Sequence, residues 1–513
     1  MVPDKADEPA GKDIPQDPVD RLAQERFGIA HLAPLQRFVI ANILEAEEPD
    51  REEPDREDCT MRQIVLFPTG FGKSVCFQLP ALMLKGLTVV LYPLLALMND
   101  QKRRLEESGL SCVLFRGELS QDEWERQRQA LASGSARIVI ANPEILASQK
   151  LRALLSRFPI SHLVIDEAHC IAEWGETFRP AYRAVGEIAD LLAPRIVSAF
   201  TATAGPAIID SIAQHLFQGN PFRLVNSEAD RPNLRYMVVH ALSPARALRQ
   251  LLTVCPKPAI VFERSRPGTR YIAEQLRNAG FPETRFYHAG LSRAERNALE
   301  AWFQSSNDGV LASTNAYGMG VDKKNIRTVI HTGLPDSAEA YIQEAGRGGR
   351  DGKPALAIFI HDLGNPLDSE KPESPTTTPL AIRRERFAPY PLIEGCRREF
   401  LLKQMGEEAT PACGTCDNCA LPGASSTLSD MLKRSEGFSE ALSFFSANRR
   451  RLQIEQCIKY LGPAGRGLCP RGGVLAHWTE IERKELVQAL LKLGIISTIR
   501  KGPWKNAIDV HIP

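Results

Sequence analysis

Residues 67–74 read Phe-Pro-Thr-Gly-Phe-Gly-Lys-Ser and directly follow an apolar run. A glycine-containing turn between a strand and a helix presents backbone N–H groups to phosphate oxygens, and its lysine adds positive charge at the β- and γ-phosphates. We therefore expect a nucleotide site in which Lys73 contacts phosphate and the Ser74 hydroxyl binds Mg²⁺. The other turn residues expected at the phosphates are Thr69, Gly70 and Gly72. Phe67 stands where the common pattern has its first glycine, and the alternative is a glycine-rich turn without a ligand.

Two neighbouring carboxylates, Asp166 and Glu167, stand at the end of another apolar run. Carboxylates at the carboxyl end of a strand suit metal-assisted phosphoryl transfer. We expect Asp166 to hold Mg²⁺, directly or through water, and Glu167 to orient or deprotonate the attacking water. Such a pair is commonly structural, but its position downstream of a phosphate-binding turn favours the catalytic interpretation.

A third group, Gln343, Arg347 and Arg350, lies in the sequence Gln-Glu-Ala-Gly-Arg-Gly-Gly-Arg-Asp at residues 343–351. Arginines three residues apart can fall on one face of a helix. From there they could reach the charge that develops on a γ-phosphate, as arginine fingers do. The alternative is a surface helix held by salt bridges.

Four of the eleven cysteines crowd into residues 396–419, whereas the other seven are scattered. The four are Cys396, Cys413, Cys416 and Cys419. Two-residue gaps let neighbouring thiolates meet one tetrahedral Zn²⁺ at about 2.3 Å. A long intracellular chain does not need disulfides, so we interpret the group as metal ligands. An iron–sulfur cluster is the alternative, because thiolates bind both metals.

The elements that must position these groups alternate between short β-rich runs and helical patterns, which predicts mostly parallel sheets covered by helices. The first set of predicted strands is 63–67, 88–92, 137–141, 162–166 and 195–200, with a helix at 74–85. The second set is 259–262, 284–287, 310–313, 328–331 and 355–360, with a helix at 269–278. We expect two α/β units that meet near residues 230–235.

The C-terminal segment has the pattern of a winged-helix domain. Residues 480–493 are amphipathic at helical spacing and stop at Gly494. Residues 495–500 and 507–512 are expected to form a hairpin with Lys501, Trp504 and Lys505 at its tip. We expect Trp504 to stack on a terminal base pair while the lysines hold phosphates. The alternative is that Trp504 packs against its own domain.

The chain has 513 residues with a net charge of +1, but the charge is uneven. Residues 1–60 carry 7 Lys or Arg and 16 Asp or Glu, whereas residues 421–513 carry 14 basic and 8 acidic residues. An acidic start and a basic remainder are compatible with nucleic-acid binding. The sequence contains no run of about 18 apolar residues, so we expect no membrane helix. The N-terminus has no apolar core, so we expect no secretory signal and no membrane partner.

Taken in order, these motifs resemble superfamily 2 helicases and, more narrowly, the RecQ family of DNA helicases. The resemblance covers residues 27–419, with a weaker continuation to the C-terminus. The stretches that resemble the family's motifs are 92–101, 141–144, 166–170, 174–175, 178–180, 182–183, 201–203, 230–236, 287–290 and 316–322.

This resemblance implies an α/β protein with two RecA-like parallel-sheet lobes, a small zinc-binding module and a C-terminal winged helix. The expected parts are a disordered acidic tail (1–20), a first lobe (21–229) with an acidic loop (45–58), a second lobe (230–362), a Pro-rich linker and helical approach (363–395), a zinc module (396–424) and a winged-helix-like domain (425–513). It also implies an ATP-dependent 3′–5′ DNA helicase for repair or recombination, with ATP between the lobes. ATP, Mg²⁺ and Zn²⁺ are the expected cofactors, and single-stranded and forked duplex DNA the partners.

The resemblance also assigns residues. An aromatic-rich loop after the acidic pair, with Trp174, Phe178, Arg179 and Tyr182, suits stacking on single-stranded bases. Thr203 is expected to contact DNA, and Gly318 and Asp322 are expected to contact the nucleotide. Trp174 and Phe178 could instead be core residues.

Adenine is expected to be read by Gln36, whose amide can make two hydrogen bonds to the base edge. Ile29 stands where the family has an aromatic residue, and Ala33 where it has an arginine. We therefore predict weaker nucleotide binding or looser discrimination against GTP.

An RNA helicase and a DNA-stimulated ATPase that remodels or anneals DNA remain alternatives. The expected location is cytoplasmic and nucleoid-associated in a bacterium, or nuclear in a eukaryote.

Overall fold

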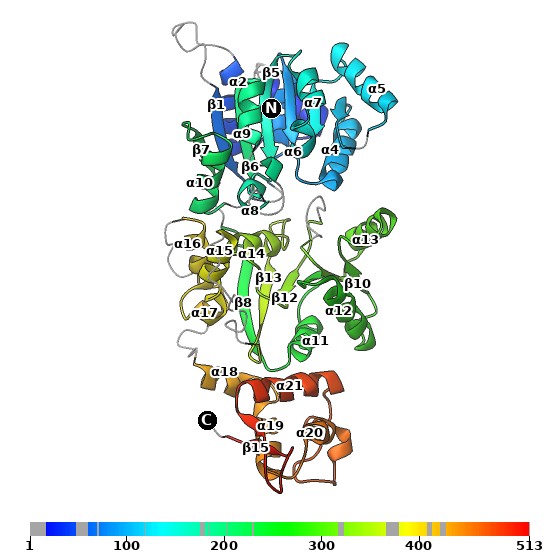
Figure 1. Cartoon of the computed structure of the whole chain (residues 1–513), viewed down its shortest axis with the longest axis vertical. Coiled ribbons are helices and arrows are strands. Elements are labelled where there is room, and N and C mark those ends of the chain that lie inside the picture. The colour runs from blue at the N-terminus through cyan, green and yellow to red at the C-terminus, as the bar shows by residue number, and fades with distance from the viewer. Residues whose placement is uncertain are drawn as a thin grey trace, which may run out of the picture. The chain divides into compact units, whose positions relative to one another are not determined.

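The computed structural model describes most of the chain, which divides into two compact units, Met1–Glu228 and Ala229–Pro513 (Figure 1). The described residues are 17–47, 60–68, 71–117, 119–174, 180–182, 184–202, 204–227, 230–315, 323–365, 379–407, 413–420 and 427–511. Among them, no helix is long and apolar enough to cross a membrane. Each unit is considered separately.

The first unit is built on a seven-stranded parallel sheet with the strand order β3-β4-β2-β5-β6-β1-β7. The strands are β1 (Met61–Leu66), β2 (Leu87–Leu91), β3 (Cys112–Leu114), β4 (Ile138–Ala141), β5 (Ile160–Asp166), β6 (Ile196–Thr201) and β7 (Arg223–Asn226). All five strands predicted for this unit are present. The two that the sequence did not predict, β3 and β7, are the short strands at the sheet edges.

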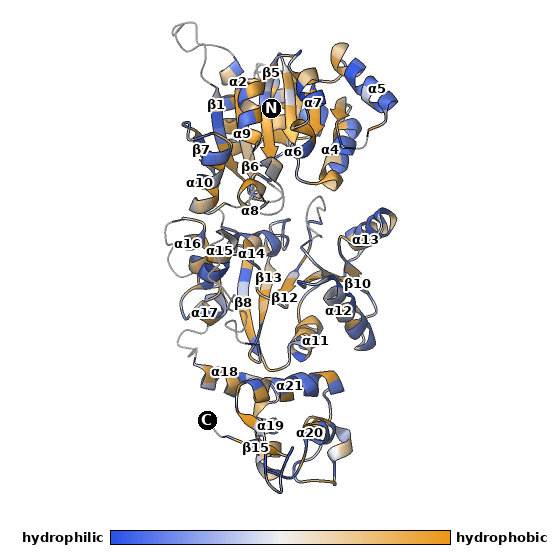
Figure 2. Ribbon diagram, viewed as in Figure 1, coloured by the Kyte–Doolittle hydropathy of each residue, from blue (hydrophilic) through white to orange (hydrophobic). Residues whose placement is uncertain are grey.

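Helices surround this sheet, and Figure 2 shows the strands as largely hydrophobic and much of helix α5 as hydrophilic. The helices are α1 (Pro18–Phe27), α2 (Pro34–Glu47), α3 (Val75–Gln78), α4 (Leu95–Glu107), α5 (Gln121–Ala132), α6 (Pro143–Leu146), α7 (Gln149–Leu155), α8 (Cys170–Trp174), α9 (Val185–Leu192) and α10 (Pro206–His215). Strand β5 is buried along its whole length. A parallel sheet covered on both faces requires such continuous apolar strands.

Three expectations for this unit need correction. The helix predicted at 74–85 is shorter: α3 ends at Gln78, and a 3-10 turn follows at Pro80–Leu82 because proline has no N–H for the helical ladder. The tail predicted as disordered to residue 20 includes the start of α1, which Asp17 caps by accepting from the Val19 N–H. The acidic loop was predicted for residues 45–58, but residues 45–47 belong to α2, and the rest of the predicted loop lies outside the described residues.

The second unit contains a six-stranded parallel sheet with the order β10-β11-β9-β12-β13-β8. The strands are β8 (Leu234–Ala241), β9 (Ala259–Phe262), β10 (Thr284–Tyr287), β11 (Val310–Ser313), β12 (Thr328–His331) and β13 (Ala355–Asp362). The helices beside them are α11 (Pro244–Val254), α12 (Arg266–Asn278), α13 (Arg293–Ser305) and α14 (Ala338–Ala345). The five predicted strands are all present. Strand β8, which begins inside the predicted junction, was missed.

The remainder of the second unit holds the cysteines and the C-terminal segment. The helices are α15 (Pro379–Phe387), α16 (Arg397–Gln404), α17 (Asp417–Ala420), α18 (Leu428–Arg434), α19 (Phe438–Ala447), α20 (Ile454–Leu461) and α21 (Glu480–Lys492). The predicted hairpin is confirmed as the antiparallel pair β14 (Ile496–Thr498) and β15 (Ile508–Val510). Helices followed by a hairpin are compatible with a winged helix, and that assignment stays a prediction.

Candidate nucleotide, metal and DNA sites

Three neighbouring strands of the first unit, β1, β5 and β6, carry the groups of the candidate nucleotide site at their carboxyl ends. The phosphate-binding turn follows β1, Asp166 ends β5 and Thr201 ends β6. Because these strands are parallel, their carboxyl ends meet at one edge of the sheet, where ligands of such sheets bind. Phe67 donates its N–H to the Thr201 carbonyl at 3.1 Å, and its buried ring packs on Phe71 at 4.7 Å between centroids. This packing explains how a phenylalanine can replace the usual first glycine of the turn.

Lys73 and Glu167 form the central ion pair of this edge, with 3.7 Å between Lys73 Nζ and Glu167 Oε1. Both side chains are largely buried. Ser74 lies at the start of α3, and its hydroxyl makes no capping bond. The structure thus brings together the lysine, the serine's helix and the acidic pair that the sequence predicted to act on one nucleotide.

Glu167 has a left-handed backbone, with φ of 51°, which is uncommon for a residue other than glycine. Its Oε2 lies 3.5 Å from His169 Nδ1, and this nitrogen lies 2.9 Å from Thr201 Oγ1. The neighbouring Ala168 N–H donates to the Phe200 carbonyl. These contacts hold the carboxylate of Glu167 at the end of β6. His169 and Thr201 fall within stretches that resemble family motifs, but the sequence alone predicts no role for either.

Asp166 ends β5 and accepts a hydrogen bond from the Glu167 N–H at 3.0 Å. Burial raises the pKa of its carboxyl to about 6, with the Glu167 charge adding to the rise and Lys73 opposing it. Two buried carboxylates beside a single lysine leave an excess of negative charge. That excess suits a divalent cation, so these residues fit Mg²⁺.

Gln36 connects helix α2 to the phosphate-binding turn. Its Nε2 donates to the Phe71 carbonyl at 2.6 Å, and its Oε1 accepts from the Ala33 N–H at 2.9 Å. Gly72 has φ of +81°, and a Cβ there would lie 2.6 Å from Gln36 Nε2. A side-chain amide keeps one more N–H and one more lone pair, so Gln36 can still bond an adenine edge. Its predicted role in reading adenine stays a prediction.

The arginine loop, residues 346–351, is not helical, so the expectation that its two arginines share one face of a helix is wrong. Gln343 lies within α14, but this helix ends at Ala345 and both Arg347 and Arg350 follow in turns. Glycines end the helix, and Gly349 adopts φ of +56°, where a Cβ would lie 2.5 Å from Asn233 Nδ2. Arg347 is buried.

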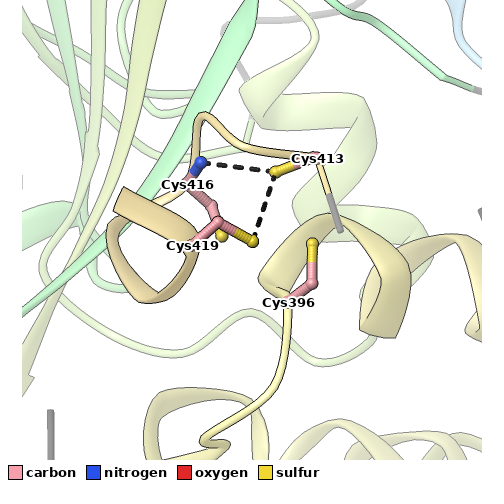
Figure 3. Close-up of side chains that lie close together, drawn as sticks. All are labelled: Cys396, Cys413, Cys416 and Cys419. Atoms are coloured by element: carbon pink, nitrogen blue, oxygen red, sulfur yellow. Dashed lines mark hydrogen bonds between the residues drawn. The ribbon is translucent and has the colours of Figure 1, made fainter. Parts of the chain in front are cut away.

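The four predicted cysteine ligands come together in the second unit (Figure 3). Their sulfurs all lie within 4.8 Å of one another, and Cys413 and Cys419 Sγ are 3.9 Å apart. A tetrahedral ion with bonds of about 2.3 Å holds its sulfurs about 3.8 Å apart. The group therefore fits one Zn²⁺ better than an iron–sulfur cluster, whose thiolates bind separate irons.

The predicted DNA residues are only partly described. Tyr182 is 1% exposed and belongs to the core of the first unit, so its predicted stacking on a base is wrong in this structure. The side chain of Trp174 lies outside what is described. So do Phe178, Arg179 and Thr203, together with the nucleotide residues Thr69, Gly70, Gly318 and Asp322.

Trp504 lies in the turn between β14 and β15 and is 49% exposed. The guanidinium of Arg450 lies 5.5 Å from the centroid of its ring. The ring is thus about half exposed and also lies against an arginine of its own domain, so both base stacking and packing against the domain stay predictions. Lys501 and Lys505 beside it are exposed.

Three protein-family models match the chain in the order of its motifs. A DEAD/DEAH box helicase model matches residues 34–211, and a helicase conserved C-terminal domain model matches residues 244–352. A RecQ zinc-binding model matches residues 388–420, which include all four clustered cysteines. The chain belongs to the RecQ family of helicases. This confirms the resemblance found in the sequence.

Individual relatives support the assignment of this chain to the RecQ family. The ATP-dependent DNA helicase RecQ of Pasteurella multocida is 37% identical over 365 residues, covering 70% of this chain and 57% of that protein. The probable ATP-dependent DNA helicase RecS of Bacillus subtilis is 36% identical over 342 residues, or 66% of each chain. The chain thus spans little more than half of the Pasteurella relative's length.

Solved structures support the fold of the RecQ-family chain. The DUF1998 helicase MrfA bound to DNA has a TM-score of 0.56 at 20% identity, covering 88% of this chain and 61% of that one. The DEAD-box helicase Mss116 bound to single-stranded RNA has a TM-score of 0.53 at 19% identity, covering 68% and 74%. Both similarities show the two-lobed helicase fold.

Proposed function

We propose that this chain is an ATP- and Mg²⁺-dependent DNA helicase that moves 3′ to 5′ along single-stranded DNA and separates duplexes in DNA repair or recombination. The observation that supports this most strongly is the cluster of Lys73, Asp166 and Glu167 at the carboxyl edge of the first sheet. Membership of the RecQ family supports DNA as the substrate.

In the proposed reaction, Lys73 would bind the β- and γ-phosphates. The Ser74 hydroxyl and Asp166 would hold Mg²⁺. The bound metal would neutralise charge on the phosphates. Glu167 orients the attacking water and accepts its proton, while His169 and Thr201 keep the carboxylate in place. Gln343, Arg347 and Arg350 stabilise the charge that develops on the transferred phosphoryl group.

Glu167 is linked through His169 to Thr201 at the end of β6, and this link suggests how DNA is coupled to hydrolysis. Thr201 precedes Thr203, which is predicted to contact DNA, and Glu167 precedes the stretch of sequence that contains Trp174, Phe178 and Arg179. DNA bound to these segments would therefore act on the residues that hold the catalytic carboxylate. Trp504 at the hairpin tip would stack on the base pair being opened.

The cysteines Cys396, Cys413, Cys416 and Cys419 would bind one Zn²⁺. The contacts among their sulfurs and the match to the RecQ zinc-binding model support this assignment. The ion would be structural, because four thiolates fill a tetrahedral shell and leave no open position for a substrate.

The test is the rate of ATP hydrolysis with no nucleic acid, with single-stranded DNA and with RNA, for the wild type and Lys73→Ala. We expect DNA to raise the wild-type rate more than RNA does, and Lys73→Ala to abolish hydrolysis. No stimulation by DNA would refute the proposal. Stimulation by DNA without unwinding of a forked duplex would favour a remodelling ATPase, and a larger response to RNA would favour an RNA helicase.

A further inference from the structure

Three backbone carbonyls of the arginine loop accept hydrogen bonds from one guanidinium. Arg231 donates to the carbonyls of Gly346, Gly348 and Gly349 at 3.3, 3.2 and 3.0 Å. Asn233 adds bonds from its Nδ2 to the carbonyls of Gly349 and Lys353. A run of glycines has little conformational preference of its own. These bonds therefore help to fix the loop that carries the two arginines, together with bonds from the Gly349 and Asp351 N–H groups to the Ile326 and Lys324 carbonyls.

The residues on either side of Arg231 are held by a buried arginine of helix α16. The Arg398 guanidinium pairs with Asp230 Oδ1 at 2.8 Å and donates to the Leu234 carbonyl at 2.5 Å. Its side chain is 6% exposed. Charged hydrogen bonds in such a dry position are strong and directional, and breaking one leaves a buried charge without its partner. Arg398 therefore fixes the segment from which Arg231 reaches the loop.

The preceding residue, Arg397, connects the same helix to the cysteines. Its Nε donates to Asp417 Oδ1 at 2.6 Å, and Asp417 Oδ2 accepts the Val238 N–H of β8 at 2.8 Å. Asp417 lies between Cys416 and Cys419, and Arg397 directly follows Cys396. The cysteine module, residues 396–420, is thus bonded to the strand that Arg398 also holds.

We infer that the cysteine module positions the arginine loop for phosphoryl transfer through Arg398, Asp230 and Arg231. Arg231 and Arg398 are positioning residues, and this inference rests on the proposed ATP hydrolysis. Arginines that meet charge only in the transition state contribute nothing to ground-state binding. A shift of the loop should therefore weaken binding of a transition-state analogue and leave binding of ADP unchanged.

The experiment measures the dissociation constants of ADP and of ADP with aluminium fluoride for the full zinc-loaded chain and its Arg231→Ala and Arg398→Ala variants. A dissociation constant does not depend on how much of a sample is inactive, so simple destabilisation does not change it. We expect the analogue to bind roughly 10- to 100-fold more weakly in both variants, the range that misplacement by about 1 Å produces. ADP should bind as it does to the wild type.

The matched control is Lys403→Ala, which removes an exposed cation from the same helix. It should bind both ligands as the wild type does. Arg231→Lys keeps a donor and should recover part of the analogue's affinity. If an alanine variant does not fold, Asp230→Asn removes only the charge that Arg398 pairs with, and it should weaken the analogue in the same direction.

Wild-type affinity for the analogue in folded, zinc-loaded Arg231→Ala, Arg398→Ala or Asp230→Asn would overturn the inference. An equal loss of affinity for ADP and for the analogue would also overturn it, because the residues would then support nucleotide binding in general. If the wild type itself does not hydrolyse ATP, the proposed function is wrong and the inference falls with it. Wild-type hydrolysis together with unchanged variants would refute the inference alone.

Discussion

At the scale of single residues, the two members of the acidic pair have different surroundings. Asp166 is buried at the strand end, and burial raises its pKa to about 6. Glu167 stands one residue farther in a left-handed conformation and faces Lys73 and His169. This arrangement suits one carboxylate for a metal ion and the other for water.

Glu167→Gln tests the water-activating role. The amide keeps the side chain's size but cannot accept a proton, so we expect kcat for ATP hydrolysis to fall about 100-fold or more, with ATP affinity retained. Steady-state hydrolysis and nucleotide titration measure the two quantities. Glu187→Gln, at an exposed position of α9, should keep the wild-type rate. A Glu167→Gln rate close to wild type would contradict the assignment.

Gly72→Ala tests the turn. The new Cβ would lie 2.6 Å from Gln36 Nε2 in a left-handed backbone, so we expect ATP affinity to fall about tenfold and stability by about 1 kcal/mol. Gly134 has φ of +69° and open space around it, so Gly134→Ala should cost similar stability without altering ATP affinity. Equal ATP affinity in the two variants would show that the contact between Gln36 and the turn is unimportant.

At the scale of elements, helix α21 is hydrogen-bonded to helix α11, which lies beside the second sheet. Arg249 makes two hydrogen bonds to Glu482 at 2.7 and 3.1 Å, and Glu485 accepts from the Ser243 hydroxyl and the Ala245 N–H. Gly364 also lies close to Ala489, so that a Cβ there would clash with it. These contacts attach the C-terminal helices and hairpin firmly to the second sheet.

Arg249→Ala should weaken this attachment. Glu482 is buried and loses its charged partner, so we expect the free energy of unfolding to fall by about 2 kcal/mol. Urea unfolding measures the change. Arg270→Ala, which removes an exposed arginine of α12, should leave the unfolding midpoint in place. An unchanged midpoint for Arg249→Ala would show that the contact contributes nothing to stability.

The paired strands β8 and β13 carry a histidine pair, with His240 Nδ1 and His361 Nδ1 2.9 Å apart. Burial, aided by the charge of Arg397, lowers both pKa values from 6.5 to about 4. Because the folded pKa lies below the unfolded pKa, the fold favours neutral imidazoles. Their stabilising contribution is present above pH 6.5 and is lost as the pH falls toward 4.

Urea unfolding between pH 7 and pH 4 tests this pair. His361→Phe removes one of the two groups, so the loss of stability in this range should be smaller than in the wild type. His477→Phe changes an exposed histidine and should keep the wild-type pH dependence. Identical pH dependence in the wild type and His361→Phe would contradict the expectation.

The sequence predicted the central strands of both sheets because their apolar runs are buried on both faces and leave a clear pattern. It missed β3 and β7, whose few residues at sheet edges leave a weak pattern. The sequence pattern favoured a helix for Arg347 and Arg350, because glycines within a helical pattern do not show at which residue the helix ends. The contacts of Arg231 and Arg398 could not be predicted, since they join segments more than 100 residues apart.

At the scale of the whole molecule, the groups proposed to act on ATP, zinc and DNA are divided between the two units. The first carries the phosphate turn and the acidic pair, and the second carries the arginine loop, the cysteine module and the hairpin with Trp504. The order of these groups could be predicted because each has a local pattern. Many of the basic residues that make the C-terminal segment positively charged, such as Arg450 and Lys505, are exposed.

Zinc content tests the cysteine module as a part of the whole chain. The purified protein should contain about one Zn²⁺ per chain, since four thiolates complete one tetrahedral site. Cys413→Ser should lose most of the ion and unfold at a lower temperature. Cys255→Ser, at a cysteine outside the module, should retain the ion. A full complement of zinc in Cys413→Ser would contradict the proposed ligand set.

The most direct test of the helicase proposal is strand separation on two partial duplexes that differ only in which end carries the single-stranded tail. With ATP and Mg²⁺, we predict that the wild type displaces the strand from the 3′-tailed duplex, and that Glu167→Gln displaces neither. Failure of the wild type to separate either duplex, while it hydrolyses ATP in their presence, would contradict the proposal.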